Sequence, residues 1–173
     1  KRNQYVLYSF APLPKTITSH FGSRVRMKVL PRLGYMRVWM KLAVNMNGPD
    51  VFIAASQAMP ETAIPTLGFM YDAAFNEFGQ LYSNADRLKT NTRDLVARAR
   101  HILTISNASK DEIVKQYSVD ERNISVYYPA ANKDFSPHGA KYIDNKPYFL
   151  YVGALKQTKN IAKLVVAFSK FNQ

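Results

Sequence analysis

The residues best placed to do chemistry lie where predicted strands give way to helices. Gly153 comes directly after the apolar stretch 148–152, and Lys159 stands at the start of the next helical pattern. A glycine at such a turn lets a ligand approach the backbone, and a lysine adds positive charge to the free N–H groups of a helix N-terminus. These are the parts of a cradle for a diphosphate. The alternative is a simple turn glycine beside a solvated lysine.

Two earlier strands also end in polar residues. Tyr71 and Asp72 follow the predicted strand 66–70, and Ser106 follows the apolar run 102–105. The carboxyl ends of parallel strands meet at one edge of a sheet, where open α/β sheets bind their ligands. A carboxylate at this edge can orient a sugar hydroxyl, and a serine can donate to a ligand. The structural alternatives are a turn-forming aspartate and a helix cap.

Other chemistries find no support in the sequence. The three histidines, His20, His101 and His138, lie far apart, and the chain has no cysteine, so we predict no metal site. The chain contains no Gly-x-Ser-x-Gly elbow, no Walker-type loop and no Gly-x-Gly-x-x-Gly motif, which removes the commonest hydrolase, nucleotidase and dinucleotide-binding interpretations.

The strongest structural signal is the stretch 99–128, which predicts a strand, a helix and a second strand. A short apolar run, 102–105, is typical of a parallel strand buried on both faces. Ser106 and Ser109 are both suitable N-caps for the helix, and Ser109 with Glu112 has capping-box spacing. The apolar stretch starting at Ile124 then closes a βαβ unit.

The rest of the chain predicts further alternation of strands and helices. The predicted strands are 5–10, 51–55, 66–70 and 148–152; the helices are 35–46, 86–99 and 161–168; and 16–33 is expected to be loop with short helical pieces. The fold class is therefore α/β with a Rossmann-like parallel sheet. We expect an N-terminally truncated domain over 1–136, a linker over 137–146, and the first βα unit of a second Rossmann-like domain over 147–173.

Composition sets wider limits. The 173 residues carry a net charge of +12 and are 47% hydrophobic, which indicates a globular protein attracted to polyanions. Nucleic acid, anionic lipid and phosphorylated ligands all fit that charge, and a basic solvated face is the alternative. No apolar run could span a bilayer and no signal peptide is visible, so we predict a location in the cytoplasm or peripherally on the inner face of a membrane. Because the chain opens on Lys1 without a Met and stops inside an apolar helical pattern, we expect it to be a segment of a larger protein.

Several stretches together resemble, in order and spacing, the retaining GT-B glycosyltransferases of the large glycogen-synthase-like group. They are 49–52, 64–72, 104–113, 124–130, 134–137, 147–153 and 159–161. The resemblance implies two Rossmann-like domains facing across a cleft. It also implies a nucleotide-sugar donor bound by the C-terminal domain, an acceptor bound mostly by the N-terminal domain, and no metal or cofactor.

The resemblance also implies roles on the donor side. Lys159 matches the family lysine that stabilises the leaving diphosphate, and Gly153 and Asn160 fall among the donor-binding residues. The arginine that often completes this clamp would stand at Ala154 or Thr158, so half of the clamp is missing from this chain.

On the acceptor side, the resemblance places Tyr71 and Asp72 where relatives carry His-Asp, with the histidine beside the transferred sugar, and Ser106 on the same rim. A tyrosine can hydrogen-bond a hydroxyl but does not relay protons near neutral pH. Tyr71, Asp72 and Lys159 are the residues to which we assign catalysis.

The function predicted on these grounds is transfer of a hexose from a nucleoside diphosphate sugar to a glycan or lipid-linked acceptor, with retention of configuration. The family's paired glutamates would lie beyond Gln173 and its glycine-rich loop before Lys1, so we expect this segment to be inactive alone. The alternatives are a basic α/β module that binds nucleic acid and a transferase-like fold without activity. The aromatic residues lie mostly at core periods, so we expect no nucleic-acid partner.

Overall fold

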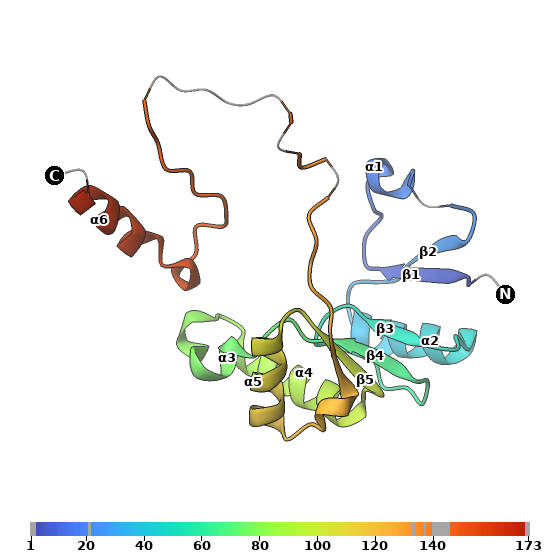
Figure 1. The fold of residues 1–173 in the computed structure, drawn as a ribbon. Coiled ribbons are helices and arrows are strands. Elements are labelled where there is room, and N and C mark those ends of the chain that lie inside the picture. The colour runs from blue at the N-terminus through green and yellow to red at the C-terminus, as the bar shows by residue number, and fades with distance from the viewer. Residues whose placement is uncertain (1–2, 21, 133, 137, 140–145, 172–173) are drawn as a thin grey trace.

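The computed structural model describes residues 3–20, 22–132, 134–136, 138–139 and 146–171 (Figure 1). Its centre is a parallel sheet of four strands in the order β3-β4-β5-β6. The strands are β3 (Phe52–Ala54), β4 (Thr66–Phe69), β5 (His101–Thr104) and β6 (Ile124–Val126). The predicted α/β class with a parallel sheet is confirmed.

Helical crossovers join β4 to β5 and β5 to β6, whereas the loop 55–65 connects β3 to β4. Between β4 and β5 the chain forms α3 (Ala74–Glu77), the 3-10 turn η2 (Gly79–Leu81) and α4 (Ala85–Arg98). Between β5 and β6 it forms α5 (Asn107–Tyr117) and the 3-10 turn η3 (Glu121–Asn123). Because α4 contacts β4 and α5 contacts both β5 and β6, the strand–helix–strand unit forms as the sequence predicts.

The hydrophobic core lies between this sheet and its helices. Leu95 of α4, Ile102 of β5 and Ile113 of α5 are almost completely buried. Gly68 allows the closest approach, since a Cβ atom added there would lie 2.9 Å from Cδ2 of Leu95. The glycine therefore determines how near α4 can lie to the middle of β4.

A second, two-stranded parallel sheet precedes the central one. It consists of β1 (Tyr5–Ser9) and β2 (Val25–Val29), which are connected through the short helix α1 (Lys15–Thr18). The strand predicted over 5–10 is confirmed, but the expectation of loop and helical pieces over 16–33 is wrong for β2. Valine and methionine alternate with Arg26 and Lys28 in β2, and this two-residue period is a strand signal despite the charges.

The helix predicted over 35–46 begins as a π-helix. Gly34, with φ of 71°, turns the chain into η1 (Tyr35–Met40), which continues as α2 (Lys41–Asn47) and ends at Gly48. The indole of Trp39 donates to the carbonyl of Leu33 at 3.0 Å and thereby fixes the start of η1. Met40 and Val44 are buried and join this segment to the core.

The C-terminal part differs from its prediction. The stretch 148–152 is exposed and forms no strand, because among the described residues no neighbouring strand pairs with its backbone groups. The 3-10 turn η4 (Gln157–Lys159) and α6 (Ile161–Phe171) follow, and α6 stands apart from the sheet (Figure 1). Phe149 packs edge-on against Phe168, with ring centroids 5.3 Å apart.

The predicted βα unit is thus represented by its helix without its strand. Most of the predicted linker, including residues 140–145, lies outside the described residues. The division into domains at 136 and 147 remains a prediction. None of the helices in the described ranges has both the length and the hydrophobicity needed to cross a bilayer.

Candidate functional site

Tyr71 and Asp72 lie at the carboxyl edge of the sheet, directly after β4. The last ladder bond before them runs from the N–H of Met70 to the carbonyl of Leu103, at 2.9 Å. The side chain of Tyr71 is 47% exposed, and its ring lies against that of Phe69. A hydroxyl on an exposed side chain at this edge is available to a ligand.

The backbone of this pair is held from both neighbouring strands. Gln57, which follows β3, donates from Nε2 to the carbonyl of Asp72 at 3.4 Å. Thr104, the buried last residue of β5, donates from Oγ1 to the carbonyl of Tyr71 at 3.5 Å. Both bonds are long, so each is weak, but together they connect three strand ends at one point.

The carboxylate of Asp72 starts the next helical turn. Its Oδ1 accepts from the N–H of Ala74 at 3.1 Å, which is the turn-forming role that the sequence left open. Its other oxygen makes no hydrogen bond to a described residue. Burial raises the pKa of Tyr82, and the negative charge of Asp72 raises it further. Asp72 therefore combines a structural bond with an oxygen that can accept from a ligand.

Ser106 is the N-cap of α5. Its Oγ accepts from the N–H of Ser109 at 3.1 Å and donates to the hydroxyl of Ser109 at 3.0 Å. The capping box predicted between Ser109 and Glu112 does not form, because α5 is capped at Ser106 and Ser109 lies inside the helix. Glu112 accepts instead from Gln116 at 2.8 Å. Ser106 lies at the same sheet edge as Tyr71, and its acceptor-side role stays a prediction.

A further polar contact, which the sequence analysis missed, joins α3 to α5. The side chain of Asn76 donates from Nδ2 to the hydroxyl of Tyr117 at 2.7 Å and also to Oε1 of Gln116. The partners are about forty positions apart in the chain, so no local spacing could reveal them. The contact holds the turn that follows Asp72 against the helix that Ser106 caps.

The donor-side residues lie in the separate C-terminal part. Gly153 lies beside the exposed side chain of Tyr151, whose hydroxyl a Cβ atom added at Gly153 would approach to 2.6 Å. Lys159 is exposed at the end of η4, and Asn160, with φ of 52°, connects η4 to α6. Within the described residues, no hydrogen bond or ion pair links Lys159 to the Tyr71 edge. The donor-side roles therefore stay predictions.

Of two cavities that the described residues line, the larger, about 980 Å³, begins beside this edge. It lies between η1, the loop after β3, and α4, and Gln57, the donor to Asp72, is part of its lining. The lining residues on α4 recur every three or four positions and so share one face of the helix. They include Arg87, Asn91, Asp94 and Arg98. The sequence analysis gave a solvated basic face as one alternative for the net charge and did not single out these residues, although their helical spacing could have indicated a common surface.

The two acids in this lining are already paired. Arg98 binds Asp94 through two nitrogens, one contact being 2.7 Å from Nε to Oδ1, and this hydrogen bonding raises the pKa of Arg98. Lys41 lies 2.6 Å from Glu61 and lowers the pKa of that carboxyl. The other two arginines of the lining, Arg37 and Arg87, form no ion pair with a described residue. Their positive charge is therefore not offset within the cavity.

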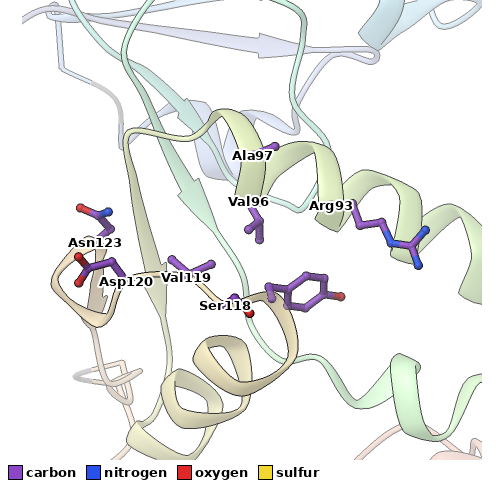
Figure 2. Close-up of a pocket in the computed structure, with 8 residues that line it drawn as sticks. Arg93, Val96, Ala97, Ser118, Val119, Asp120 and Asn123 are labelled. Carbon is purple, nitrogen blue, oxygen red and sulfur yellow. The ribbon is translucent and has the colours of Figure 1, made fainter.

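The smaller cavity, about 470 Å³, lies at the opposite edge, where β5 and β6 begin. Figure 2 shows Val96 and Val119 pointing into it from two sides, while Arg93 extends away from them. Asp120 at its end is held by Arg122, which lowers the pKa of that carboxyl to about 2. None of the predicted site residues lines this cavity. Within the described residues no three His, Asp or Glu side chains gather to hold a metal ion.

The parallel sheet and the alternation of its strands with helices define an α/β domain of Rossmann-like architecture. No family model matches the chain. Over 71 residues the chain is 44% identical to the O-antigen chain mannosyltransferase RfbU of Salmonella typhimurium strain LT2. That similarity covers 40% of this chain and 19% of the Salmonella protein, so the chain spans about a fifth of its relative's length.

Proposed function

We propose that this chain is part of a glycosyltransferase that moves a hexose from a nucleoside diphosphate sugar to a glycan or lipid-linked acceptor, with retention of configuration. The observation that carries the proposal is the 44% identity over 71 residues with a mannosyltransferase. The parallel sheet and the chained GT-B-like motifs support it. Mannose is accordingly the first sugar to test.

In this proposal the sheet edge is the acceptor side. The free oxygen of Asp72 accepts a hydrogen bond from a sugar hydroxyl, and the exposed hydroxyl of Tyr71 binds the same sugar. Ser106 lies on this rim as the cap of α5. Gln57 and Thr104 donate long hydrogen bonds to the carbonyls of Asp72 and Tyr71, which together limit how far the main chain of this turn moves when the substrate binds.

The donor side supplies charge stabilisation. As the bond from the sugar to the diphosphate breaks, negative charge grows on the leaving group, and Lys159 stabilises that charge. Gly153 and Asn160 are the other donor-binding residues in this proposal. The chemistry requires no metal from this chain, since an ammonium group performs the electrostatic task.

Sugar transfer by the full-length protein containing this chain tests the proposal. With GDP-mannose labelled in the sugar, Lys159→Ala should lower kcat at least a hundredfold, a typical loss for one group that stabilises transition-state charge. Lys156→Ala, a matched change three positions away, should leave kcat within twofold. Equal activity of both variants would exclude Lys159 from catalysis, and full activity of residues 1–173 alone would refute the proposed incompleteness of this segment.

The basic charge supports a peripheral site on anionic membrane. Arg26 and Lys28 are exposed on one face of β2, and Met27 and Val29 are exposed on the other. The exposed basic side chains supply attraction to acidic headgroups. Sedimentation with phosphatidylglycerol vesicles should remove the chain from solution at low salt and not at high salt. Retention of the chain in solution at low salt would refute this partner.

A further inference from the structure

The charge balance of the larger cavity points to an anionic ligand. Its acids, Glu61 and Asp94, are neutralised by Lys41 and Arg98. Arg37 and Arg87 also line the cavity, and neither forms an ion pair or hydrogen bond with a described residue. Two unpaired guanidinium groups in one concave surface make it electropositive, because a cavity concentrates the field of its charges.

We propose that this cavity binds the phosphate or diphosphate group of the acceptor, held by Arg37 and Arg87. The assignment of that group to an acceptor rests on the proposed function. Two guanidinium groups offer about ten N–H donors, whereas a carboxylate accepts at about four sites. A diphosphate has enough oxygen atoms to accept hydrogen bonds from both guanidinium groups, so it suits Arg37 and Arg87 better than a carboxylate does.

The position of Arg87 relative to the predicted catalytic residues supports this role. The crossover leaves β4 at the carboxyl edge, and α4 then returns toward the start of β5, so Arg87 in its first turn lies near that edge. Gln57 lines the same cavity and bonds to the carbonyl of Asp72. An acceptor anchored by its phosphate in the cavity therefore has its sugar beside Asp72.

Both arginines are carried by well-anchored elements. Leu95 and Thr92, on a neighbouring face of α4, are completely buried and anchor the helix, so the face that carries Arg87 is held in position beside the cavity. Arg37 stands in the π-helix η1, whose first turn is fixed by Gly34 and by the indole of Trp39. Such helices are rare and frequently occur at functional sites.

The lining also has apolar surface. Met36 and Leu88 are half-buried beside the arginines, and Met59 is almost completely buried. A lipid chain attached to the diphosphate could contact these side chains, whereas a soluble phosphorylated glycan would not need them. The two sources share the same anionic group and differ only in the attached chain.

Calorimetric titration of the chain with inorganic pyrophosphate tests the site. Arg37→Gln and Arg87→Gln should each weaken binding about tenfold, as expected for a lost hydrogen bond to a charged group. Arg93→Gln removes the same charge from the same helix, but from the other cavity, and should change binding less than twofold. Circular dichroism and the Tm of each variant confirm that it is folded.

The remaining outcomes separate this inference from the proposed function. Equal weakening by Arg93→Gln, or no pyrophosphate binding at all, would overturn the assigned site. If Lys159→Ala abolished binding while both cavity variants bound normally, the anion would belong to the donor side and only this inference would fail. Farnesyl diphosphate distinguishes the sources: tighter binding than pyrophosphate indicates a lipid-linked acceptor, and equal binding a soluble one.

Discussion

Gly68→Ala is the substitution whose effect follows most directly from the structure. The added methyl group would lie 2.9 Å from Cδ2 and 3.0 Å from Cγ of Leu95, closer than such atoms pack. β4 cannot withdraw, because it is hydrogen-bonded to β3 and β5 on its two sides. The strain must therefore be relieved by α4 or by Leu95, and α4 carries one wall of the larger cavity.

The magnitude follows from the packing. Overfilling a well-packed core costs about 1–3 kcal/mol, and we expect Gly68→Ala to lower the free energy of unfolding by that amount. Leu95→Ala creates a cavity in a fully buried site and should cost about 2–5 kcal/mol. In the double variant the new methyl group occupies part of the space that the leucine vacates. The combined loss should therefore be smaller than the sum by about 1–2 kcal/mol.

Urea unfolding followed by circular dichroism measures all three variants. Gly79→Ala is a suitable control, since a Cβ atom there meets its nearest neighbour at 3.5 Å, an ordinary contact. This control should change the free energy of unfolding by less than about 0.5 kcal/mol. Strict additivity of Gly68→Ala and Leu95→Ala, or no loss in Gly68→Ala alone, would refute the steric reasoning.

Two further predictions concern local polar contacts. Ser106→Ala should lower the free energy of unfolding by about 1 kcal/mol, because α5 loses its N-cap. Ser106→Asp should keep most of this free energy, since aspartate is also a good N-cap. Equal stability of the original protein and both variants in urea would contradict the capping role. Arg122 lowers the pKa of Asp120 to about 2, so the pair stabilises the fold above the ordinary carboxyl pKa of 3.8 and loses this effect as pH falls through about 2. In Arg122→Gln, the pKa of the Asp120 carboxyl measured by NMR should rise but stay below 3.8, because the main-chain N–H of residue 122 still donates to Oδ1 at 2.9 Å; an unchanged midpoint would contradict the side-chain pairing.

The sequence alone predicts the elements whose signals are local. Around 102–126, the apolar run, the cap at Ser106 and the second apolar run all lie within a single βαβ unit, so spacing along the chain was sufficient. The candidate residues Tyr71, Asp72 and Ser106 could be assigned to one edge for the same reason, because parallel strands bring their carboxyl ends together.

The features that could not be predicted depend on long-range contacts. The stretch 148–152 has the composition of a buried strand, yet a strand forms only where a partner supplies hydrogen bonds, and composition does not indicate that partner. The Asn76 contact and the cavity between η1 and α4 join residues about forty or more positions apart. The charges on α4 had the spacing of one face, but only the packed structure shows that this face borders a cavity.

The two hydrogen bonds that fix the Tyr71–Asp72 turn are made to main-chain carbonyls, which every amino acid possesses. These two hydrogen bonds therefore do not depend on which side chain residue 71 carries. Tyr71 can be replaced, by histidine for example, while both hydrogen bonds to the main chain of this turn are kept. The protein thus offers a place where reactivity can be redesigned separately from architecture.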